Sequence, residues 1–397
     1  MSNLKTLTLR DVCQATQGVQ IPKSSQSKIP KKNFKRYFYI SDFTHDKNLK
    51  YVEDKYPKKN FTCEDIIVSN TGSHGEVFIG KEGILSNNLF KVTFDKEIIN
   101  GSFLVLFLKS NLFKDFQLKR VKGTANPHMG HENFLDTPII LPPLPVQQKI
   151  VAKLDKIFAE IDKTIVLTEA KTKNLQNFFN SYFFFLKTKN YTNWKKKKIG
   201  QLCNLMTGGT PSTKEKKYYQ NGNIPWLVSG DIHLDIISDC NGRITELGLK
   251  NSNAKFLPIN SVMIALNGQG KTRGTVAILK TKATCNQSLV SIMPKDLNEI
   301  KSEIIYYILK SRYNEIRKLT GDSGNDRRGL NMPIIRKIEI SYPTSLSEQN
   351  KIIKSSNLIL SKLKKINEIN LIKINELQLL KNSILKKAFN GELVKAA

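Results

Sequence analysis

The segment ALNGQGKT, residues 265–272, has the residue types and spacing in this chain that come closest to a reactive site. Four residues separate a small residue from Gly-Lys-Thr, as in loops that hold nucleotide phosphates. Such a loop needs a helix that begins at the lysine, because the helix N-terminus binds the phosphates. Here Lys271 is followed by Gly274 and the run TVAI, which together favour a strand. A nucleotide-dependent enzyme is therefore kept only as an alternative.

The same loop carries side chains that suit the reading of DNA. Between two strands, Asn and Gln amides can pair with adenine edges, whereas Arg binds guanine or phosphate. This interpretation applies to Asn267, Gln269, Lys271 and Arg273.

The charge balance of the whole chain points to the same kind of partner. Sixty-three Lys and Arg residues stand against 34 Asp and Glu residues, which leaves a formal net charge of +29. Such an excess indicates a polyanionic partner, nucleic acid before a membrane surface. A Lys-rich proteome would explain Lys in place of Arg, but it would not explain the shortage of acids. No run of about 18 apolar residues exists, so we expect no membrane span.

Other basic and polar residues lie in loops that contain Gly or aromatic residues, where DNA contacts are expected. Each of them alone is better explained as a solvated side chain, and only their clustering in such loops favours a contact. In the first half of the chain the candidates are Lys31, Lys32, Lys35, Arg36, Asn70, Ser73, His74 and Lys122. In the second half they are Thr210, Ser212, Lys214, Lys216, Lys217, Arg327 and Arg328.

Several other chemistries find no support in the residues. The five cysteines are scattered without a CxxC pair, and His128 and His131 are better explained as polar loop residues than as metal ligands. We therefore expect reduced thiols, a cytoplasmic protein and no metal site. The N-terminus has no apolar signal-peptide core. No methyltransferase signature is present, so neither catalytic residues nor an S-adenosylmethionine site are expected in this chain.

Two long helices must position these loops, and they read as copies of one another. Each follows a Pro-containing turn, LPPLPVQQKI from Leu141 and SYPTSLSEQNKI from Ser341, so that Gln147 matches Gln349. Steps of four and three residues give two heptad seams that turn polar at the same place. The first seam is Ile150, Leu154, Ile157, Ile161, Thr164, Thr168, Lys171, Leu175, Phe178 and Tyr182. The second is Ile352, Ser356, Ile359, Leu363, Ile366, Asn370, Lys373, Leu377, Leu380 and Ile384.

This repetition predicts an antiparallel coiled coil within an internally duplicated chain. The polar layers should meet, with Thr168 and Lys171 near Asn370 and Lys373, because one buried polar layer fixes the register. Leu154 should then face the Ile384 end, and Tyr182 the Ser356 end.

The segments before the helices also correspond to each other, which gives an alternation of heads and helices. Cys13 falls on Cys203, Gly18 falls on Gly208, and NNLFKV from Asn87 resembles NQSLVSI from Asn286. Strand and helix patterns interleave in both, so the fold class is mixed α/β. The expected divisions are a first head over 1–143, a helix over 144–188, a second head over 189–345 and a helix over 346–397. The basic stretch 187–198 reads as a linker.

Four motifs on this scaffold resemble the specificity subunits of type I restriction-modification enzymes. They are TGGTPS at 207–212, GNIPWLVSGDI at 222–232, LPPLPVQQKI at 141–150 and AFNGELV at 388–394. The resemblance covers the whole chain. It departs in the first head, where TQGVQIPKS at 16–24 stands in place of TGGTPS, and YFYISDF at 37–43 is the only counterpart of GNIPWLVSGDI.

The resemblance implies two target-recognition domains that each read one half of a bipartite site in double-stranded DNA. The helices would set the spacing and dock two methyltransferase subunits, and restriction (translocase and endonuclease) subunits would join them. S-adenosylmethionine, ATP and Mg²⁺ would belong to those partners, and this chain would be non-catalytic. The main alternative is a free-standing regulator with tandem DNA-binding heads, which would lack a large apolar docking surface.

Overall fold

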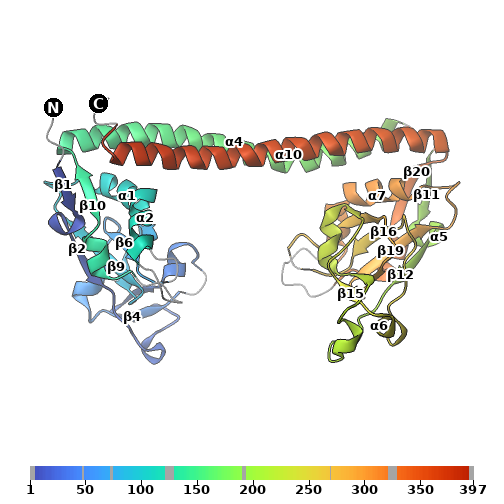
Figure 1. Cartoon of the computed structure of the whole chain (residues 1–397), viewed down its shortest axis with the longest axis horizontal. Coiled ribbons are helices and arrows are strands. Elements are labelled where there is room, and N and C mark those ends of the chain that lie inside the picture. The colour runs from blue at the N-terminus through green and yellow to red at the C-terminus, as the bar shows by residue number, and fades with distance from the viewer. Residues whose placement is uncertain are drawn as a thin grey trace. The chain divides into compact units, whose positions relative to one another are not determined.

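A computed structural model describes residues 5–46, 49–71, 75–120, 129–189, 194–268, 270–320 and 329–392. The chain divides into two compact units (Figure 1). Unit 1 combines Met1–Thr168 with Leu371–Ala397, and unit 2 is Glu169–Asn370. Both units mix helices and strands, as the sequence predicted. In the part of the chain that the structure describes, no helix is long and apolar enough to cross a membrane.

Unit 1 contains two four-stranded sheets and one two-stranded ribbon. The antiparallel sheet has the order β2-β9-β6-β7, and the other sheet, β4-β3-β8-β5, contains the parallel pair β3–β8. The strands are β1 (Lys5–Thr8), β2 (Cys13–Gln17), β3 (Phe34–Phe38), β4 (Tyr51–Glu53), β5 (Asn60–Phe61), β6 (Ile66–Ser69), β7 (Val77–Phe78), β8 (Gly83–Leu85), β9 (Leu89–Phe94) and β10 (Pro138–Leu141). The helices are α1 (Gly101–Lys109), α2 (Asn111–Arg120) and α3 (His131–Leu135), with 3-10 turns η1 (Leu9–Asp11), η2 (Lys23–Ser25), η3 (Ile40–Phe43) and η4 (Pro57–Lys59).

Unit 2 repeats this plan with small differences. Its larger sheet, β12-β19-β16-β17-β14, has an added edge strand, and the smaller sheet β15-β13-β18 again contains a parallel pair, β13–β18. The strands are β11 (Trp194–Lys198), β12 (Cys203–Thr207), β13 (Ile224–Leu227), β14 (Ile236–Ile237), β15 (Arg243–Ile244), β16 (Val262–Ala265), β17 (Val276–Leu279), β18 (Thr284–Cys285), β19 (Leu289–Pro294) and β20 (Glu339–Pro343). The helices are α5 (Ile199–Leu202), α6 (Glu246–Lys250), α7 (Ser302–Ser311), α8 (Tyr313–Lys318) and α9 (Met332–Lys337), with η6 (Lys216–Tyr218) and η7 (Ser229–Leu234).

The lysine run that the sequence suggested as linker is a strand. β11 pairs antiparallel with β20, just as β1 pairs with β10 in unit 1. Lys196 Nζ lies 2.7 Å from Glu339 Oε2, and Lys197 forms a second ion pair, with Glu299. Cross-strand and neighbouring carboxylates therefore offset part of the charge that made this stretch look like an unstructured linker.

The two long helices run in opposite directions within each unit. They are α4 (Leu144–Lys189) and α10 (Leu346–Phe389). In unit 2, Tyr182 OH lies 2.6 Å from Ser355 Oγ, and Asn370 Nδ2 donates to Thr172 Oγ1 at 3.0 Å. In this unit, residues late in α4 therefore meet residues early in α10. Unit 1 has the converse, because Leu154 shares a hydrophobic cluster with Ile384 and Leu385. The antiparallel coiled coil is confirmed.

From Ile157 and Ile359 onward, alternate positions of the two predicted seams lie one residue later in the structure, whereas the other predicted positions hold. Phe178 is 57% exposed, whereas its neighbour Phe179 is fully buried. In α10, Ile366 and Leu380 are exposed and Asn367 is half-buried. The seam positions that hold are Ile150, Leu154, Ile161, Thr168, Leu175, Tyr182, Ile352, Ser356, Leu363, Asn370, Leu377 and Ile384, and the corrected alternates are Phe158, Ile165, Thr172, Phe179, Leu360, Asn367, Ile374 and Lys381.

The cores explain this choice of seam, because each helix half packs on a head as well as on its partner helix. Figure 1 shows α1 lying between the long helices and the sheet β2-β9-β6-β7, and α7 lying between the long helices and the sheet β12-β19-β16-β17-β14. In unit 1 the Phe389 ring packs edge-on against Phe103 of α1, with centroids 5.0 Å apart. In unit 2 Phe179 contacts Tyr307 of α7 in the same way, at 6.2 Å. The position of each long helix that faces its head is therefore occupied by a phenylalanine, Phe389 in α10 and Phe179 in α4.

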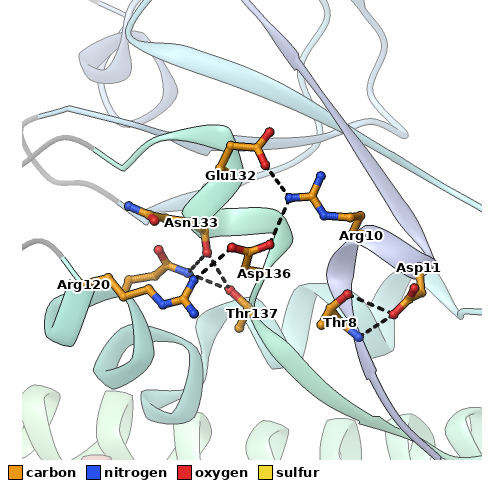
Figure 2. Close-up of polar contacts among 9 residues, drawn as sticks. Thr8, Arg10, Asp11, Arg120, Glu132, Asn133, Asp136 and Thr137 are labelled. Carbon is orange, nitrogen blue, oxygen red and sulfur yellow. Dashed lines mark hydrogen bonds and ion pairs between the residues drawn. The ribbon is translucent and has the colours of Figure 1, made fainter.

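A polar network fixes the ends of α2 and α3 in unit 1 (Figure 2). Arg10 Nη2 lies 2.5 Å from Glu132 Oε2 and 2.9 Å from Asp136 Oδ1. Arg120 Nη1 lies 3.2 Å from the second Asp136 oxygen. Hydrogen bonding from Arg10, more than that from Arg120, holds the pKa of the Asp136 carboxyl below its usual range. The network thereby anchors the two helix ends that flank residues 121–128.

Candidate nucleic-acid interface

Two glycines hold equivalent loops against equivalent turns in the heads. A Cβ on Gly18 would lie 2.0 Å from Ser86 O, and one on Gly208 would lie 1.8 Å from Cys285 O. Only glycine permits this approach of two backbones. In both units the strand that follows the turn accepts a side-chain hydrogen bond at its first carbonyl, Leu89 O or Leu289 O. The sequence match of Gly18 with Gly208 is thus a structural equivalence.

The weak match between YFYISDF and GNIPWLVSGDI is also structural. Asp42 Oδ2 accepts from Tyr39 N at 2.8 Å, and Asp231 Oδ2 accepts from Val228 N at 2.8 Å. Asp42 follows β3 and Asp231 follows β13, the first strand of the parallel pair in each unit. The first head therefore keeps the plan of the second although its residues differ.

The basic cluster of the first head separates into free and paired cations. Lys35 Nζ lies 2.9 Å from Asp54 Oδ2, and Arg36 pairs with Asp46 while it stacks over the Phe38 ring. Lys31 and Lys32 are exposed and have no carboxylate partner among the residues described. Phosphate would have to displace a carboxylate from Lys35 or Arg36, so Lys31 and Lys32 are the more accessible anion contacts.

Asn70 is placed inside the head rather than on its surface. It is 1% exposed, and its Nδ2 donates to Gln17 Oε1 at 3.2 Å and to Asn87 O at 3.3 Å. A base cannot reach this side chain without rearrangement of the loop, so we remove Asn70 from the proposed contact set. The other candidates of this loop, Ser73 and His74, lie outside the described residues, as does Lys122.

In the second head, Thr210 and Ser212 of the TGGTPS motif are exposed, whereas Gly208, Gly209 and Pro211 are buried. Ser212, Lys214 and Lys216 are exposed. Lys217 is exposed as well and pairs with Glu215 at 3.2 Å. Thr210 Oγ1 donates to Gln287 Oε1 at 2.6 Å, which ties the loop to the turn after β18.

Residues 265–272, which resemble a phosphate-binding loop in sequence, are followed by a strand, as predicted. Residues 270–274 form turns, and β17 begins at Val276, so no helix begins at Lys271. Asn267 and Lys271 are exposed, whereas Arg273 is only 7% exposed. We therefore also remove Arg273 from the proposed contact set. Gln269, Arg327 and Arg328 lie outside the described residues.

A second loop in each head returns to the same strand end. Met129 N donates to Asn70 O at 2.9 Å, and Leu330 N donates to Leu266 O at 2.9 Å. These contacts bring residues 129 and 330 to the end of β6 and of β16. Sequence reasoning missed two exposed amides beside them, Asn87 and Gln287. The sequence similarity of NNLF to NQSL could have identified them, but the sequence comparison aligned Asn87 with Asn286 instead of Gln287.

Among the residues that the structure describes, no three His, Cys, Asp or Glu side chains are grouped to hold a metal ion. Four cysteines are buried and Cys63 is exposed, and all five are free thiols.

Comparison with known families gives one match over most of the chain. Residues 1–170 and 191–379 match the family described as Type I restriction modification DNA specificity domain. The specificity subunit of the type I restriction enzyme MjaVIII from Methanocaldococcus jannaschii is 28% identical over 332 residues, which cover 77% of this chain and 75% of that protein. The Escherichia coli EcoR124I/EcoR124II specificity subunit is 25% identical over 212 residues, 53% of this chain. That match spans 51% of the E. coli protein, about half its length.

Solved structures share the fold. A chain from a study of complex assembly and conformational transition of the type I R-M system has a TM-score of 0.72 at 19% identity, covering 97% of both chains. The HsdS subunit from Thermoanaerobacter tengcongensis has a TM-score of 0.51 at 18% identity, covering 98% of this chain and 96% of its own.

Proposed function

Because the chain belongs to the type I restriction-modification DNA specificity family, we propose that it selects the DNA target of a type I restriction-modification complex, with one half-site read by each head. The observation that carries this proposal is the repetition of one loop-and-turn arrangement in two heads whose exposed residues differ. Equivalent scaffolds with different surface residues suit two different half-sites on one DNA. The net charge of +29 suits a phosphate backbone.

We assign the target-recognition domains to residues 1–143 and 189–345, and the helical segments to 144–188 and 346–397. Direct contacts are proposed for exposed residues of the heads, since a buried side chain cannot reach a base edge. Among the described candidates these are Lys31, Lys32, Lys35, Thr210, Ser212, Lys214, Lys216, Lys217, Asn267 and Lys271. Reading DNA also places the chain in the cytoplasm.

The long helices supply the surface for partner subunits. Isolated apolar side chains on a surface are ordinary, but clusters of them mark interfaces. Several large apolar side chains on α4 and α10 are half or more exposed in each unit, although both helices already have a buried seam. In unit 1 they are Val166, Leu167, Leu371, Ile372 and Leu379, and in unit 2 they are Phe178, Leu358 and Ile369.

These apolar residues favour a complex over a free-standing regulator, for which they would be a solubility cost. We propose that one methyltransferase subunit docks on the helices of each unit and that restriction subunits join this core. S-adenosylmethionine, ATP and Mg²⁺ would act in those partners. The chain itself would be non-catalytic and would supply sequence selection and spacing.

The test is the methylated motif in cells that carry the chain with its methyltransferase subunit. Exchange of residues 194–343 for the second head of another family member should rewrite one half-site and leave the other unchanged. Insertion of one helical turn after Ala170 should keep both half-sites and change the spacer between them. The proposal fails if deletion of the chain leaves the genome's methylated motifs unchanged, or if the head exchange rewrites both half-sites.

A further inference from the structure

Two exposed amide side chains occupy the same position in the two heads. β9 begins at Leu89 and β19 begins at Leu289, and these leucines pair with the last residues of β6 and β16. Two residues before each leucine lie Asn87 and Gln287, both exposed, in the turns that lead from β8 to β9 and from β18 to β19. Structural register therefore aligns Asn87 with Gln287, where sequence comparison had aligned it with Asn286.

The turn around each amide is held in place by side chains of the head. In unit 1, Asn87 O accepts hydrogen bonds from Gln17 Nε2 and from the buried Asn70. In unit 2, Thr207 Oγ1 donates to Leu289 O at 2.8 Å, and Asn286 Oδ1 accepts from Ser288 N at 3.0 Å. Asn286 thus forms the turn, and Gln287 is not needed for it. Recognition residues work best on such a fixed support.

Each amide is also oriented by the loop that follows the closely packed glycine of its own head, Gly18 or Gly208. Asn87 Nδ2 lies 3.4 Å from Gln20 Oε1, and Gln287 Oε1 accepts from Thr210 Oγ1 at 2.6 Å. A primary amide has two N–H donors and two acceptor positions on its oxygen. Each contact uses one of these four positions, so both amides keep at least one donor and one acceptor at the surface.

We propose that Asn87 and Gln287 are equivalent specificity-determining residues, each of which reads one base edge in the half-site of its own head. A free donor beside a free acceptor matches the N7 and N6 edge of adenine in the major groove. Adenine is therefore the base expected opposite each residue. This inference rests on the proposed function, since it needs the heads to read separate half-sites.

The experiment uses the full chain assembled with its methyltransferase subunits. Asn87→Ala should relax one base position in one half-site, and Gln287→Ala should relax one position in the other. Discrimination for adenine at that position should fall about 10- to 100-fold. Motifs are read from genomic methylation and from selection of bound DNA out of a random pool, so that a preference is measured even where methylation is weak.

Matched controls come from the duplication. Gln14 and Asn204 are exposed amides at equivalent positions of β2 and β12, and Gln14→Ala and Asn204→Ala should leave both half-sites unchanged. Asn87→Gln and Gln287→Asn keep the amide and move it by one methylene. They provide a second test in case the alanine variants misfold. These swaps should also alter the preference at the same two positions.

The possible outcomes distinguish failure of this inference from failure of the proposed function. If wild type yields a bipartite motif and the folded variants at 87 and 287 leave every base preference intact, the inference is overturned and the function stands. It is also overturned if one variant relaxes both half-sites. If the wild-type complex selects no motif at all, the proposed function has failed.

Discussion

Gln147 and Gln349 make the same three hydrogen bonds in the two units. Gln147 Oε1 accepts from Asn100 N at 2.8 Å, and its Nε2 donates to Ile98 O and Pro142 O, both at 2.9 Å. Gln349 Oε1 accepts from Lys301 N at 2.9 Å, and its Nε2 donates to Glu299 O and Pro343 O at 2.9 and 3.0 Å. Both side chains are fully buried. Each glutamine therefore ties the start of a long helix to the chain at the N-cap of α1 or α7.

Alanine at either position should be strongly destabilising. Gln147→Ala leaves one backbone N–H and two carbonyls without this partner inside the unit, and unsatisfied buried groups cost about 1–3 kcal/mol each. Allowing for partial solvation of these groups, we expect a loss of about 2–4 kcal/mol in the free energy of unfolding. Denaturant titration measures it. The exposed neighbours provide controls, since Gln148→Ala and Asn350→Ala should change stability by less than about 0.5 kcal/mol.

The sequence was sufficient for those features that a repeat imposes twice. Gln147 with Gln349 and Gly18 with Gly208 were paired correctly, because a buried amide and a close backbone approach tolerate few substitutions. The antiparallel arrangement of the helices followed from the two-fold symmetry that an internal duplication implies. The register error at Phe178 had a physical origin, since apolar residues stand at both 178 and 179 and periodicity alone cannot choose between them. The head decides, because only Phe179 meets Tyr307.

The candidate DNA-contacting residues were harder to predict than the helices, because single residues in loops show no periodicity. Arg273 and Asn70 have side chains suited to DNA, yet both are buried. Lys35 and Arg36 gave the same signal as Lys31 and Lys32, but their carboxylate partners Asp54 and Asp46 lie 10 or more residues away in the chain. Such pairings depend on the tertiary fold.

The adjacent residues Phe178 and Phe179 should separate assembly from folding. Phe179→Ala removes a buried ring from the core of unit 2 and should cost about 3–5 kcal/mol of stability. Phe178→Ala should leave stability unchanged within about 0.5 kcal/mol, because the ring is 57% exposed. It should instead weaken co-purification with the methyltransferase subunit. A Phe178→Ala chain that unfolds as readily as Phe179→Ala would show that the corrected seam is wrong.

Thiol reactivity should report the integrity of both heads. Burial raises the pKa of Cys13, Cys203 and Cys285 to about 12, so these thiols stay protonated at pH 8 and are shielded from reagent. Cys240 is buried as well, with a raised pKa, whereas Cys63 is exposed. Alkylation of the native chain followed by mass spectrometry should therefore modify Cys63 alone, and denaturant should expose all five thiols. Rapid native labelling of Cys203 would contradict the described core of unit 2.

Salt dependence should identify the unpaired lysines as phosphate contacts. Each phosphate neutralised by a lysine releases condensed counterions. This makes the negative slope of log affinity against log salt steeper by about 0.9. The double variant Lys31→Ala/Lys32→Ala should lower the affinity of the assembled complex for DNA and reduce that slope by about 2. The loss should be similar for target and non-target DNA, because phosphate contacts carry no sequence information.

The matched control removes the same charge from a part of unit 1 not proposed to meet DNA. Lys96→Ala/Lys114→Ala changes two exposed lysines, one of them already paired with Glu64. Its slope should stay within experimental error of wild type. If both double variants reduced the slope equally, the effect would reflect net charge alone. In that case Lys31 and Lys32 would have no special place in the interface, and binding would rest on the diffuse field of the whole chain.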